Sequence, residues 1–246
     1  MAGEVQTSFR RYEKKYLLTP RQHEALLRGV RGYMTEDAYG RYSICNVYYD
    51  TEDFSLIRAS LDKPYYKEKL RVRSYGTPES QDRVFVELKK KAGGVVYKRR
   101  VQLAAGLVPR YLDGDLALSP GGQISREIEW FQRFHRTQPR VFIGYDRTAF
   151  AGTEQSALRM TFDTNLRWRT DALDLRAGSG GAPLLPPDRI LMELKIPGAA
   201  PLWLCGLLSD VGAYPVSFSK YGVCYRDHIM AGRGYTELEK EARYSA

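Results

Sequence analysis

Charged residues two positions apart recur along this chain, inside segments that otherwise consist of apolar and β-branched residues. Glu87-x-Lys89 follows Val84-Phe85-Val86, and Glu193-x-Lys195 follows Ile190-Leu191-Met192. Because side chains at i and i+2 of a strand point to the same face, each stretch predicts a strand with one charged and one apolar face. The spacing also occurs in Arg11-x-Glu13-x-Lys15, Arg71-x-Arg73, Lys98-x-Arg100 and Arg167-x-Arg169.

The alternation and the turn signals between apolar segments predict a chain made mainly of strands. Thr19 is expected to be the N-cap of a helix that begins at Pro20, and Gly93-Gly94 predicts a hairpin. Short connections favour antiparallel pairing. The expected strands are 9–18, 42–49, 67–75, 83–91, 95–103, 140–150, 158–170 and 189–196, and the expected helices are 20–30, 50–59, 119–136, 201–211 and 219–231.

A sheet with an apolar face and a mostly cationic face does not fit a lone half-buried sheet. It fits a sheet closed around a polar interior that holds a polyanion and a metal ion, since closure also removes the sheet edges. The Gly/Pro-rich segment 177–187 is interpreted as an excursion within one domain and not as a linker. We therefore expect a mainly-β α+β fold, a closed antiparallel barrel with flanking helices, as one domain over 1–246.

The composition indicates a basic protein, and its cysteines favour a reducing cellular compartment. The 246 residues include 38 Lys and Arg against 29 Asp and Glu, a net charge of +9. Cys45, Cys205 and Cys224 are widely spaced, which predicts three reduced thiols in a cytoplasmic protein, and no zinc site or disulfide framework. No signal peptide and no apolar run of about 18 residues is found, so no membrane segment is expected.

The cations of the predicted strands are candidate phosphate ligands. Arg donates two parallel hydrogen bonds to phosphate, and Lys acts as a compact point charge. Ser219 is the expected N-cap of a helix whose N-terminus helps to hold phosphate beside Lys220. The candidate triphosphate- or polyphosphate-binding residues are Lys15, Arg71, Arg73, Lys89, Lys98, Arg100, Arg147, Arg169, Lys195, Ser219 and Lys220.

Three glutamates interrupt this cationic pattern. Glu87, Glu193 and Glu13 are candidate ligands for Mg²⁺ or Mn²⁺, which prefer oxygen donors and bridge phosphate oxygens. The alternative is that each glutamate forms an exposed cross-strand ion pair, worth about 0–1 kcal/mol. The chain has no phosphate-binding loop, no G-x-G-x-x-G and no G-x-S-x-G, so a nucleotide-using enzyme of the P-loop or kinase type is not expected.

A series of motifs, in order along almost the whole chain, resembles the polyphosphate polymerase (VTC) domain of the vacuolar transporter chaperone family, in the triphosphate tunnel metalloenzyme (CYTH-like) superfamily. The motifs are Arg11-Tyr-Glu-Lys-Lys-Tyr16, Val47-Tyr-Tyr-Asp-Thr51, Lys69-Leu-Arg-Val-Arg-Ser-Tyr75, Val84-Phe-Val-Glu-Leu-Lys89, Tyr97-Lys-Arg-Arg100, Tyr145-Asp-Arg-Thr-Ala-Phe150, Thr161-Phe-Asp-Thr-Asn-Leu166, Leu191-Met-Glu-Leu-Lys195 and Phe218-Ser-Lys-Tyr221. Arg11 departs from the Glu-x-Glu-x-Lys motif of the superfamily's hydrolases.

The resemblance implies an eight-stranded antiparallel tunnel in which the γ-phosphate of ATP passes to the end of a polyphosphate chain, with Mn²⁺ or Mg²⁺ present. Glu193 matches the family's metal-binding carboxylate. Pyrophosphate or phosphate are further expected ligands, no nucleic acid is expected, and a membrane protein could be a partner. The matching phosphate-binding positions are Lys15, Arg71, Arg73, Lys89, Lys98, Arg147, Lys195 and Lys220, and the implied catalytic set is Arg71, Arg73, Lys89, Glu193 and Lys195.

Two other functions remain open from the sequence. One is a hydrolase that releases phosphate from triphosphate or polyphosphate in the same tunnel. The other is a non-catalytic polyanion- or RNA-binding barrel, which predicts salt-sensitive binding without turnover.

Overall fold

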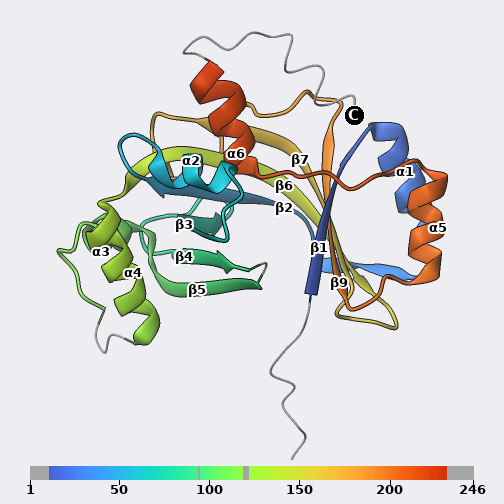
Figure 1. Cartoon of the computed structure of the whole chain (residues 1–246), viewed down its shortest axis with the longest axis horizontal. Coiled ribbons are helices and arrows are strands. Elements are labelled where there is room, and N and C mark those ends of the chain that lie inside the picture. Colours follow the sequence, from blue (N-terminus) through green and yellow to red (C-terminus); the bar gives the residue numbers. More distant parts are fainter. Residues whose placement is uncertain (1–10, 94, 119–121, 232–246) are drawn as a thin grey trace, which may run out of the picture. The chain divides into compact units, whose positions relative to one another are not determined.

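The computed structural model describes residues 11–93, 95–118 and 122–231, in which a large antiparallel sheet is accompanied by helices (Figure 1). This confirms the mainly-β α+β class. The strands are β1 (Arg11–Leu18), β2 (Met34–Asp50), β3 (Tyr66–Tyr75), β4 (Arg83–Ala92), β5 (Val95–Ala104), β6 (Gln138–Gly152), β7 (Arg159–Arg169), β8 (Ala182–Pro183) and β9 (Ile190–Pro197). The helices are α1 (Pro20–Gly29), α2 (Ser55–Leu61), α3 (Val108–Leu112), α4 (Gln123–His135), α5 (Leu202–Asp210) and α6 (Lys220–Cys224), with the π-helix η3 (Tyr225–Met230) and the short 3-10 helices η1 (Ala105–Leu107) and η2 (Leu175–Ala177).

The strand order in the sheet is β1-β9-β7-β6-β2-β3-β4-β5, and the short β8 pairs with β7. This order ends at β1 on one side and at β5 on the other. Among the described strands no pairing joins these two, so the predicted closure into a barrel is not confirmed.

The chain divides into two compact units. Within the described residues, the first unit contains the chain up to Tyr42, Tyr145–Leu166 and Leu185–Phe218. The second unit contains Ser43–Gly144, Arg167–Leu184 and the chain from Ser219 onward. The expectation of a single domain over 1–246 stays a prediction.

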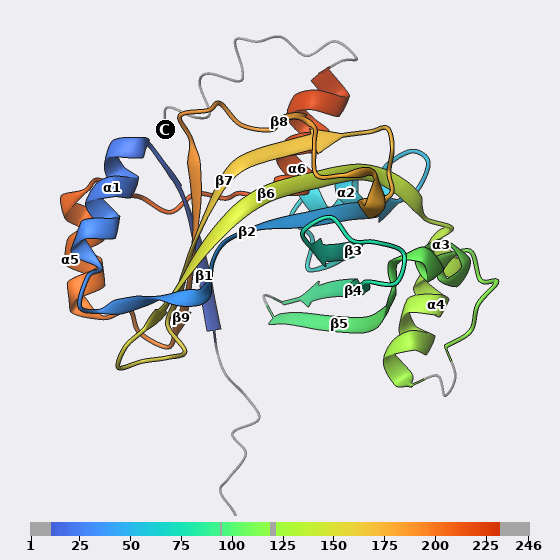
Figure 2. The ribbon, with the colours of Figure 1, turned by 180° about the vertical axis from the view of Figure 1, so that it is seen from behind.

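In the first unit, antiparallel strands β1, β9 and β7 bury one face against α1 and α5. Tyr16 lies opposite Met192, which lies opposite Phe162, and all three are buried. Figures 1 and 2 both show α1 and α5 side by side. A Cβ on Gly29 of α1 would lie 2.3 Å from a Leu207 methyl carbon of α5, so any larger residue at this position would require the Leu207 side chain to shift.

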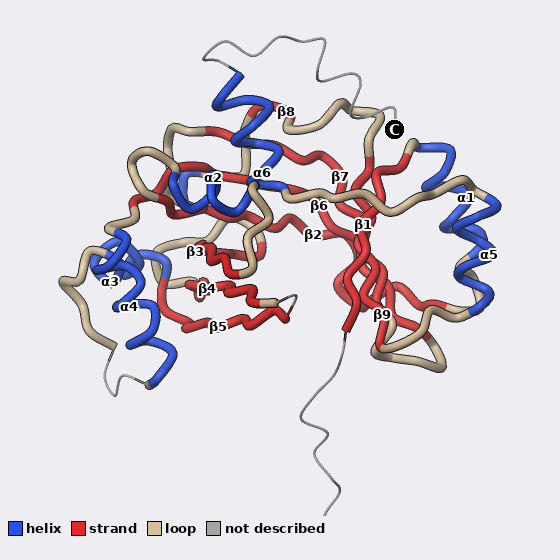
Figure 3. The backbone as a smooth tube through the Cα atoms, viewed as in Figure 1, coloured by secondary structure: helices blue, strands red, loops and turns tan. Residues whose placement is uncertain are grey.

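In the second unit, β3, β4 and β5 form two successive hairpins. Val72, Val86 and Val101 lie opposite one another and contribute to an apolar core that also includes Ile128 and Phe131 of α4. Figure 3 shows α3 and α4 next to each other beside these strands. The apolar half of each alternating segment thus faces this core, which leaves the charged half on the opposite face of the sheet.

The structure corrects several predicted boundaries. Strand β2 begins at Met34 and not at residue 42, because its first half is polar and largely exposed and carries no buried-face signal. The helix predicted from Asp50 begins at Ser55, since Asp50 stays in the strand and its carboxylate accepts hydrogen bonds from the helix backbone. The helix predicted over 219–231 is α6 followed by a π-helical turn.

Two smaller predictions concern cysteines and membrane segments. Cys45 and Cys224 are buried, Cys205 is exposed, and all three are free thiols, as predicted. Among the helices of the described residues, none combines the length and the apolar character that crossing a bilayer requires.

Candidate functional site: two polar clusters

The polar faces of β3, β4 and β5 form cross-strand rows in the second unit. One row places Glu87 between Arg71 and Arg100. The next row aligns Lys69, Lys89 and Lys98. Residues that lie directly opposite in a sheet share a face, so the register brings these separately predicted cations together.

Glu87 is the carboxylate at the centre of these rows, and it is 1% exposed. Arg71 donates to Glu87 Oε2 at 2.9 and 2.7 Å, and Arg73 Nε lies 4.0 Å from the same oxygen. Lys98 Nζ lies 2.5 Å from Oε1. Burial would raise the pKa of Glu87, but Arg71, Arg73 and Lys98 outweigh it and hold the pKa at about 2. Glu87 is therefore ionised and bound by cations on both oxygens, which favours an ion-pair role over the predicted metal role.

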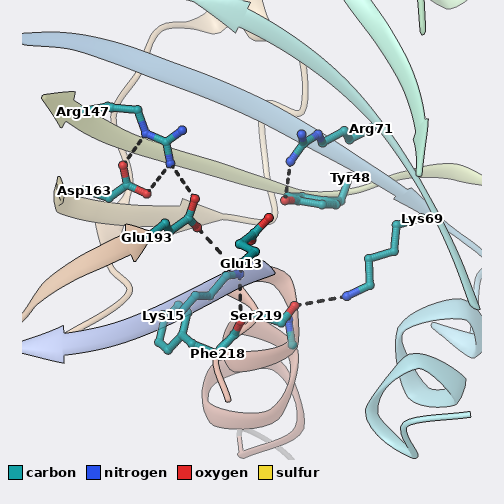
Figure 4. A network of polar contacts seen from close by, with 11 residues as sticks. Glu13, Lys15, Tyr48, Lys69, Arg71, Arg147, Asp163, Glu193, Phe218 and Ser219 are labelled. Carbon is teal, nitrogen blue, oxygen red and sulfur yellow. Dashed lines mark hydrogen bonds and ion pairs between the residues drawn. The ribbon is translucent and has the colours of Figure 1, made fainter. Parts of the chain in front are cut away.

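Further cations and hydroxyls complete this cluster in the second unit. Arg71 Nη1 donates to the Tyr48 hydroxyl at 3.3 Å, and Lys69 Nζ donates to Ser219 Oγ at 3.1 Å (Figure 4). Ser219 caps α6, whose first residue, Lys220, is only 8% exposed. We call the set of Lys69, Arg71, Arg73, Glu87, Lys98 and Lys220, with Tyr48, the cation cluster.

The first unit carries a second cluster, with the opposite balance of charge. Arg147 donates to both oxygens of the buried Asp163, at 2.6 and 2.7 Å, and to Glu193 Oε2 at 3.1 Å (Figure 4). Lys15 Nζ lies 3.7 Å from Glu193 Oε1 and from Glu13 Oε1, and donates to the Phe218 carbonyl at 3.0 Å. We call these five side chains, Glu13, Lys15, Arg147, Asp163 and Glu193, the carboxylate cluster.

Burial would lower the pKa of Arg147, but Tyr145, Asp163 and Glu193 raise it above its ordinary value. Arg147 is therefore a permanent cation that forms ion pairs with both the buried Asp163 and Glu193. The second oxygen of Glu193 lies 3.7 Å from the ammonium group of Lys15. A long ion pair of this kind is weaker than a hydrogen-bonded one.

The donors of the carboxylate cluster suit a hard divalent cation better than those of the cation cluster. Glu13 and Glu193 present carboxylate oxygens on adjacent strands, and Lys15 Nζ lies at equal distance from the two. A positive charge is thus already accommodated between them, which fits a shared Mg²⁺ or Mn²⁺. Among the described residues, no group of three or more His, Cys, Asp or Glu side chains is arranged to hold a metal.

The structure places most of the predicted site residues in or beside these clusters. The second unit contains five of them in the cation cluster or at its edge: Arg71, Arg73, Lys98, Ser219 and Lys220. Lys89 and Arg100 belong to the cross-strand rows of β3, β4 and β5, and Arg100 Cζ lies 4.8 Å from the centroid of the Phe85 ring. In the first unit, Lys195 lies between Glu13 and Arg159 in the register. Lys98 and Arg100 lie on the same face of β5, so the direction of their side chains does not decide which of the two is the phosphate ligand.

Arg169 lies apart from both clusters. Its guanidinium donates to the carbonyls of Ala172, Gly178 and Gly180 and stacks on the Phe142 ring, with Cζ 3.7 Å from the centroid. These contacts fasten the loop after β7. They favour a structural role over the phosphate role predicted from the Arg167-x-Arg169 spacing, which stays a prediction.

Three residues of the clusters were not predicted. Lys69 continues the Lys69-x-Arg71-x-Arg73 alternation, so the period of two could have found it. Asp163 stands alone among neutral neighbours, and its partner Arg147 comes from another strand. Tyr48 is uncharged, so no pattern of charged residues includes it; only the sheet register shows that it lies opposite Arg71.

Comparison with known families agrees with this picture. The family model of the VTC domain matches residues 10–228, so the chain belongs to the VTC domain family. The vacuolar transporter chaperone complex subunit 4 of Schizosaccharomyces pombe is 26% identical over 212 residues, 72% of this chain and 29% of that protein. The subunit 4 of Trypanosoma brucei brucei is 29% identical over 187 residues, 62% of this chain and 24% of that protein. The chain thus spans less than a third of the length of either relative.

Among solved structures, a Hippeastrum protein described as an adenylyl cyclase with a dominant triphosphatase activity aligns with 15% identity and a TM-score of 0.48, over 92% of this chain and 98% of that one. A protein from Vibrio parahaemolyticus described as a candidate adenylate cyclase aligns with 12% identity and a TM-score of 0.46, over 89% of this chain and 98% of that one. These scores are too low for a functional conclusion.

Proposed function

We propose that this chain is a divalent-metal-dependent phosphotransferase that moves the γ-phosphate of ATP onto the end of a polyphosphate chain. The observation that carries the proposal is the cation cluster. The charges that act on Glu87 there are Arg71, Arg73 and Lys98, three cations around one buried carboxylate. Such an excess of positive charge destabilises a protein unless an anion relieves it, and phosphate is an anion that Arg binds with two parallel hydrogen bonds and Lys as a point charge.

The residues of the chain act by positioning and by charge neutralisation, which carry most of the catalysis in phosphoryl transfer. Arg71, Arg73, Lys89 and Lys98 bind phosphate oxygens, and Lys220 adds charge at the start of α6. Lys195 is a further ligand of the triphosphate, and Lys15 and Lys220 are the candidates for the transferring phosphate or the polymer path. No strong general base is needed, because a chain-end phosphate oxygen is already anionic near neutral pH.

Glu193 and Glu13 are the residues that would hold Mn²⁺ or Mg²⁺. When bound, such an ion neutralises charge on the phosphate oxygens and polarises the bond to the leaving group. Lys15 Nζ, which lies 3.7 Å from a carboxylate oxygen of each glutamate, would give up its place between them to the metal.

The proposal extends to the form and setting of the enzyme. It includes the closed eight-stranded tunnel that the family resemblance implies, with pyrophosphate or phosphate as further ligands. Because the relatives are named as subunits of a chaperone complex, we propose that this chain acts at the cytoplasmic side of a membrane with a membrane protein as partner.

Incubation of the purified chain with ATP and Mn²⁺ tests the activity. We expect polyphosphate chains to accumulate on a gel, with loss of ATP and little free phosphate. Accumulation of free phosphate alone would identify a hydrolase instead. Tight and salt-sensitive polyanion binding without any turnover would identify a non-catalytic binding protein.

A further inference from the structure

Tyr48 is a buried tyrosine at the centre of the cation cluster, and its side chain is 7% exposed. It lies on β2 directly opposite Arg71 of β3. Its ring stacks on the ring of Tyr221 from α6, with centroids 4.7 Å apart and an angle of 22° between the planes. The phenol is thus held in one orientation by a strand on one side and a helix on the other.

The direction of the hydrogen bond between Arg71 and Tyr48 leaves the phenol O–H of Tyr48 without an acceptor among the described residues. A guanidinium can only donate, so in the contact of 3.3 Å between Arg71 Nη1 and the Tyr48 hydroxyl the phenol oxygen is the acceptor (Figure 4). The phenol proton must then point to another acceptor. In the part of the chain that the structure describes, no oxygen or nitrogen accepts it, although buried hydroxyls of tyrosine ordinarily find a partner.

The charges around Tyr48 indicate what this acceptor is. Burial would raise the pKa of Tyr48, but Arg71, Arg73 and Lys220 overcome it, and the pKa is lower than that of an ordinary tyrosine. Three cations that act on one phenol create a positive potential at its oxygen. An acceptor placed there is stabilised if it is an anion, and the anion that the cluster is suited to bind is phosphate.

The fold does not need this hydroxyl to fix the ring. Tyr221 donates its own hydroxyl to Asp50 at 2.8 Å, and Asp50 also accepts from the backbone N–H groups of Thr51, Leu56 and Ile57. Asp50 is fully buried. This chain of contacts anchors Tyr221, and through the stack it anchors Tyr48. The Tyr48 hydroxyl is therefore available for a ligand.

We propose that Tyr48 is a phosphate-binding residue whose hydroxyl donates a hydrogen bond to a non-bridging oxygen of a phosphate held by Arg71 and Lys220. This assignment rests on the proposed function, because it requires the cation cluster to bind phosphate chains. It adds a neutral donor to a site that is otherwise built from cations. A hydroxyl that both accepts from Arg71 and donates to phosphate also fixes the orientation of that guanidinium.

The first test compares Tyr48→Phe with Tyr49→Phe by calorimetric titration of the full chain with inorganic tripolyphosphate. Phe at position 48 keeps the stack on Tyr221 and removes only the hydroxyl. Tyr49 is the matched control, because it is the next residue of the same strand and faces the apolar core. We expect Tyr48→Phe to weaken binding by about ten- to a hundred-fold, the usual effect of a lost hydrogen bond to a charged group. Tyr49→Phe should change it by less than about two-fold.

The second test is spectroscopic and would not respond to a purely structural role. The groups that face the Tyr48 phenol are Arg71, Arg73, Lys220 and the Tyr221 ring. A bound phosphate accepts a hydrogen bond from the phenol, and its negative charge disfavours a tyrosinate anion beside it. Phosphate binding should therefore raise the pKa of Tyr48. We expect tripolyphosphate to shift one tyrosinate absorbance transition to higher pH in the unmodified chain and in Tyr49→Phe, but not in Tyr48→Phe.

The outcomes separate this assignment from the proposed function. Tripolyphosphate binding by the unmodified chain that is equally strong in Tyr48→Phe, with the same tyrosinate shift, overturns the role of Tyr48 and leaves the proposed function standing. Failure of the unmodified chain to bind tripolyphosphate overturns both.

Discussion

The two units of this protein carry clusters of the same kinds of charged residues, but carboxylates outnumber cations in one cluster and cations outnumber carboxylates in the other. The carboxylate cluster of the first unit has three carboxylates, Glu13, Asp163 and Glu193, against Lys15 and Arg147. In the cation cluster, one carboxylate, Glu87, meets Arg71, Arg73 and Lys98.

Both clusters arise on the polar face of strands whose other face is buried in an apolar core. The difference between them shows that alternation of apolar and charged residues is enough to produce a charged face on a strand. The identity of the cross-strand neighbours then decides which ligand that face can bind. A surplus of carboxylates suits a divalent cation, and a surplus of guanidinium and ammonium groups suits phosphate. Each of the following changes tests one side of this contrast.

The largest effect is expected from Glu193→Gln. This change keeps the shape of the side chain and removes the charge that we assign to metal binding. Metal-dependent ATP turnover should fall on the order of a hundred-fold or more, while circular dichroism shows an unchanged fold. Binding of Mn²⁺, followed by its electron paramagnetic resonance signal, should weaken in parallel.

Glu36→Gln is the control for that experiment, since Glu36 is an exposed glutamate of the first unit. It should leave turnover unchanged. Undiminished ATP consumption in Glu193→Gln would refute the metal assignment and with it the contrast between the clusters.

A large loss of stability is expected from Asp163→Leu in the same cluster. The change leaves the buried Arg147 with Glu193 as its remaining carboxylate, and removing one partner of a buried ion pair costs about 3–5 kcal/mol in the free energy of unfolding. Urea unfolding measures this loss. The double change Arg147→Met/Asp163→Leu should lose less, because it removes both charges. A double variant less stable than the single one would contradict this account.

The cation cluster should reveal itself through the pH dependence of stability. Glu87 has a pKa of about 2 in the folded protein against an ordinary 4.5. Its ion pairs therefore stabilise the fold fully above about pH 4.5, and this stabilisation, about 3 kcal/mol, is lost as the pH falls towards 2. Unfolding by urea at a series of pH values should show the loss, and Glu87→Gln should flatten that part of the profile.

Glu79→Gln serves as the matched control, since Glu79 is an exposed glutamate of the second unit. Its profile should follow that of the unmodified chain. Glu87→Gln should also bind tripolyphosphate more tightly, because one negative charge leaves the cluster. Weaker binding in this variant would show that Glu87 assists the ligand and does not merely balance the cations.

The smallest effect on phosphate binding is expected from Arg169→Gln. Its guanidinium holds the loop carbonyls of Ala172, Gly178 and Gly180, so the change should lower the free energy of unfolding by about 1–2 kcal/mol. The affinity for tripolyphosphate should stay within about two-fold. A loss of affinity comparable to that of Arg71→Ala would restore Arg169 as a phosphate ligand.

The alternation of the sequence predicted the strands and the charged faces well, because both depend on neighbours two residues apart. Arg71, Arg73 and Lys98 were identified in this way and lie together in the structure. Tyr48 and Asp163 were missed because neither belongs to a local charge pattern. Each is defined by a partner on another strand, Arg71 and Arg147 respectively.

Glu87 and Glu193 show most clearly where local sequence stops being informative. Both occur in a Glu-x-Lys pattern after an apolar run, and both were predicted to bind metal. The structure surrounds Glu87 with three cations, whereas Glu193 shares Arg147 with Asp163 and lies 3.7 Å from the Lys15 ammonium group.

The sequence by itself determined most of the long strands, which residues share a face, and that the charged faces are rich in cations; it missed the first part of β2 and the short β8. Only the tertiary structure decided which cation meets which carboxylate. The physical reason is that electrostatic interactions act across strands, between residues far apart in the chain, and their partners depend on sheet order and register, which no short window of sequence contains.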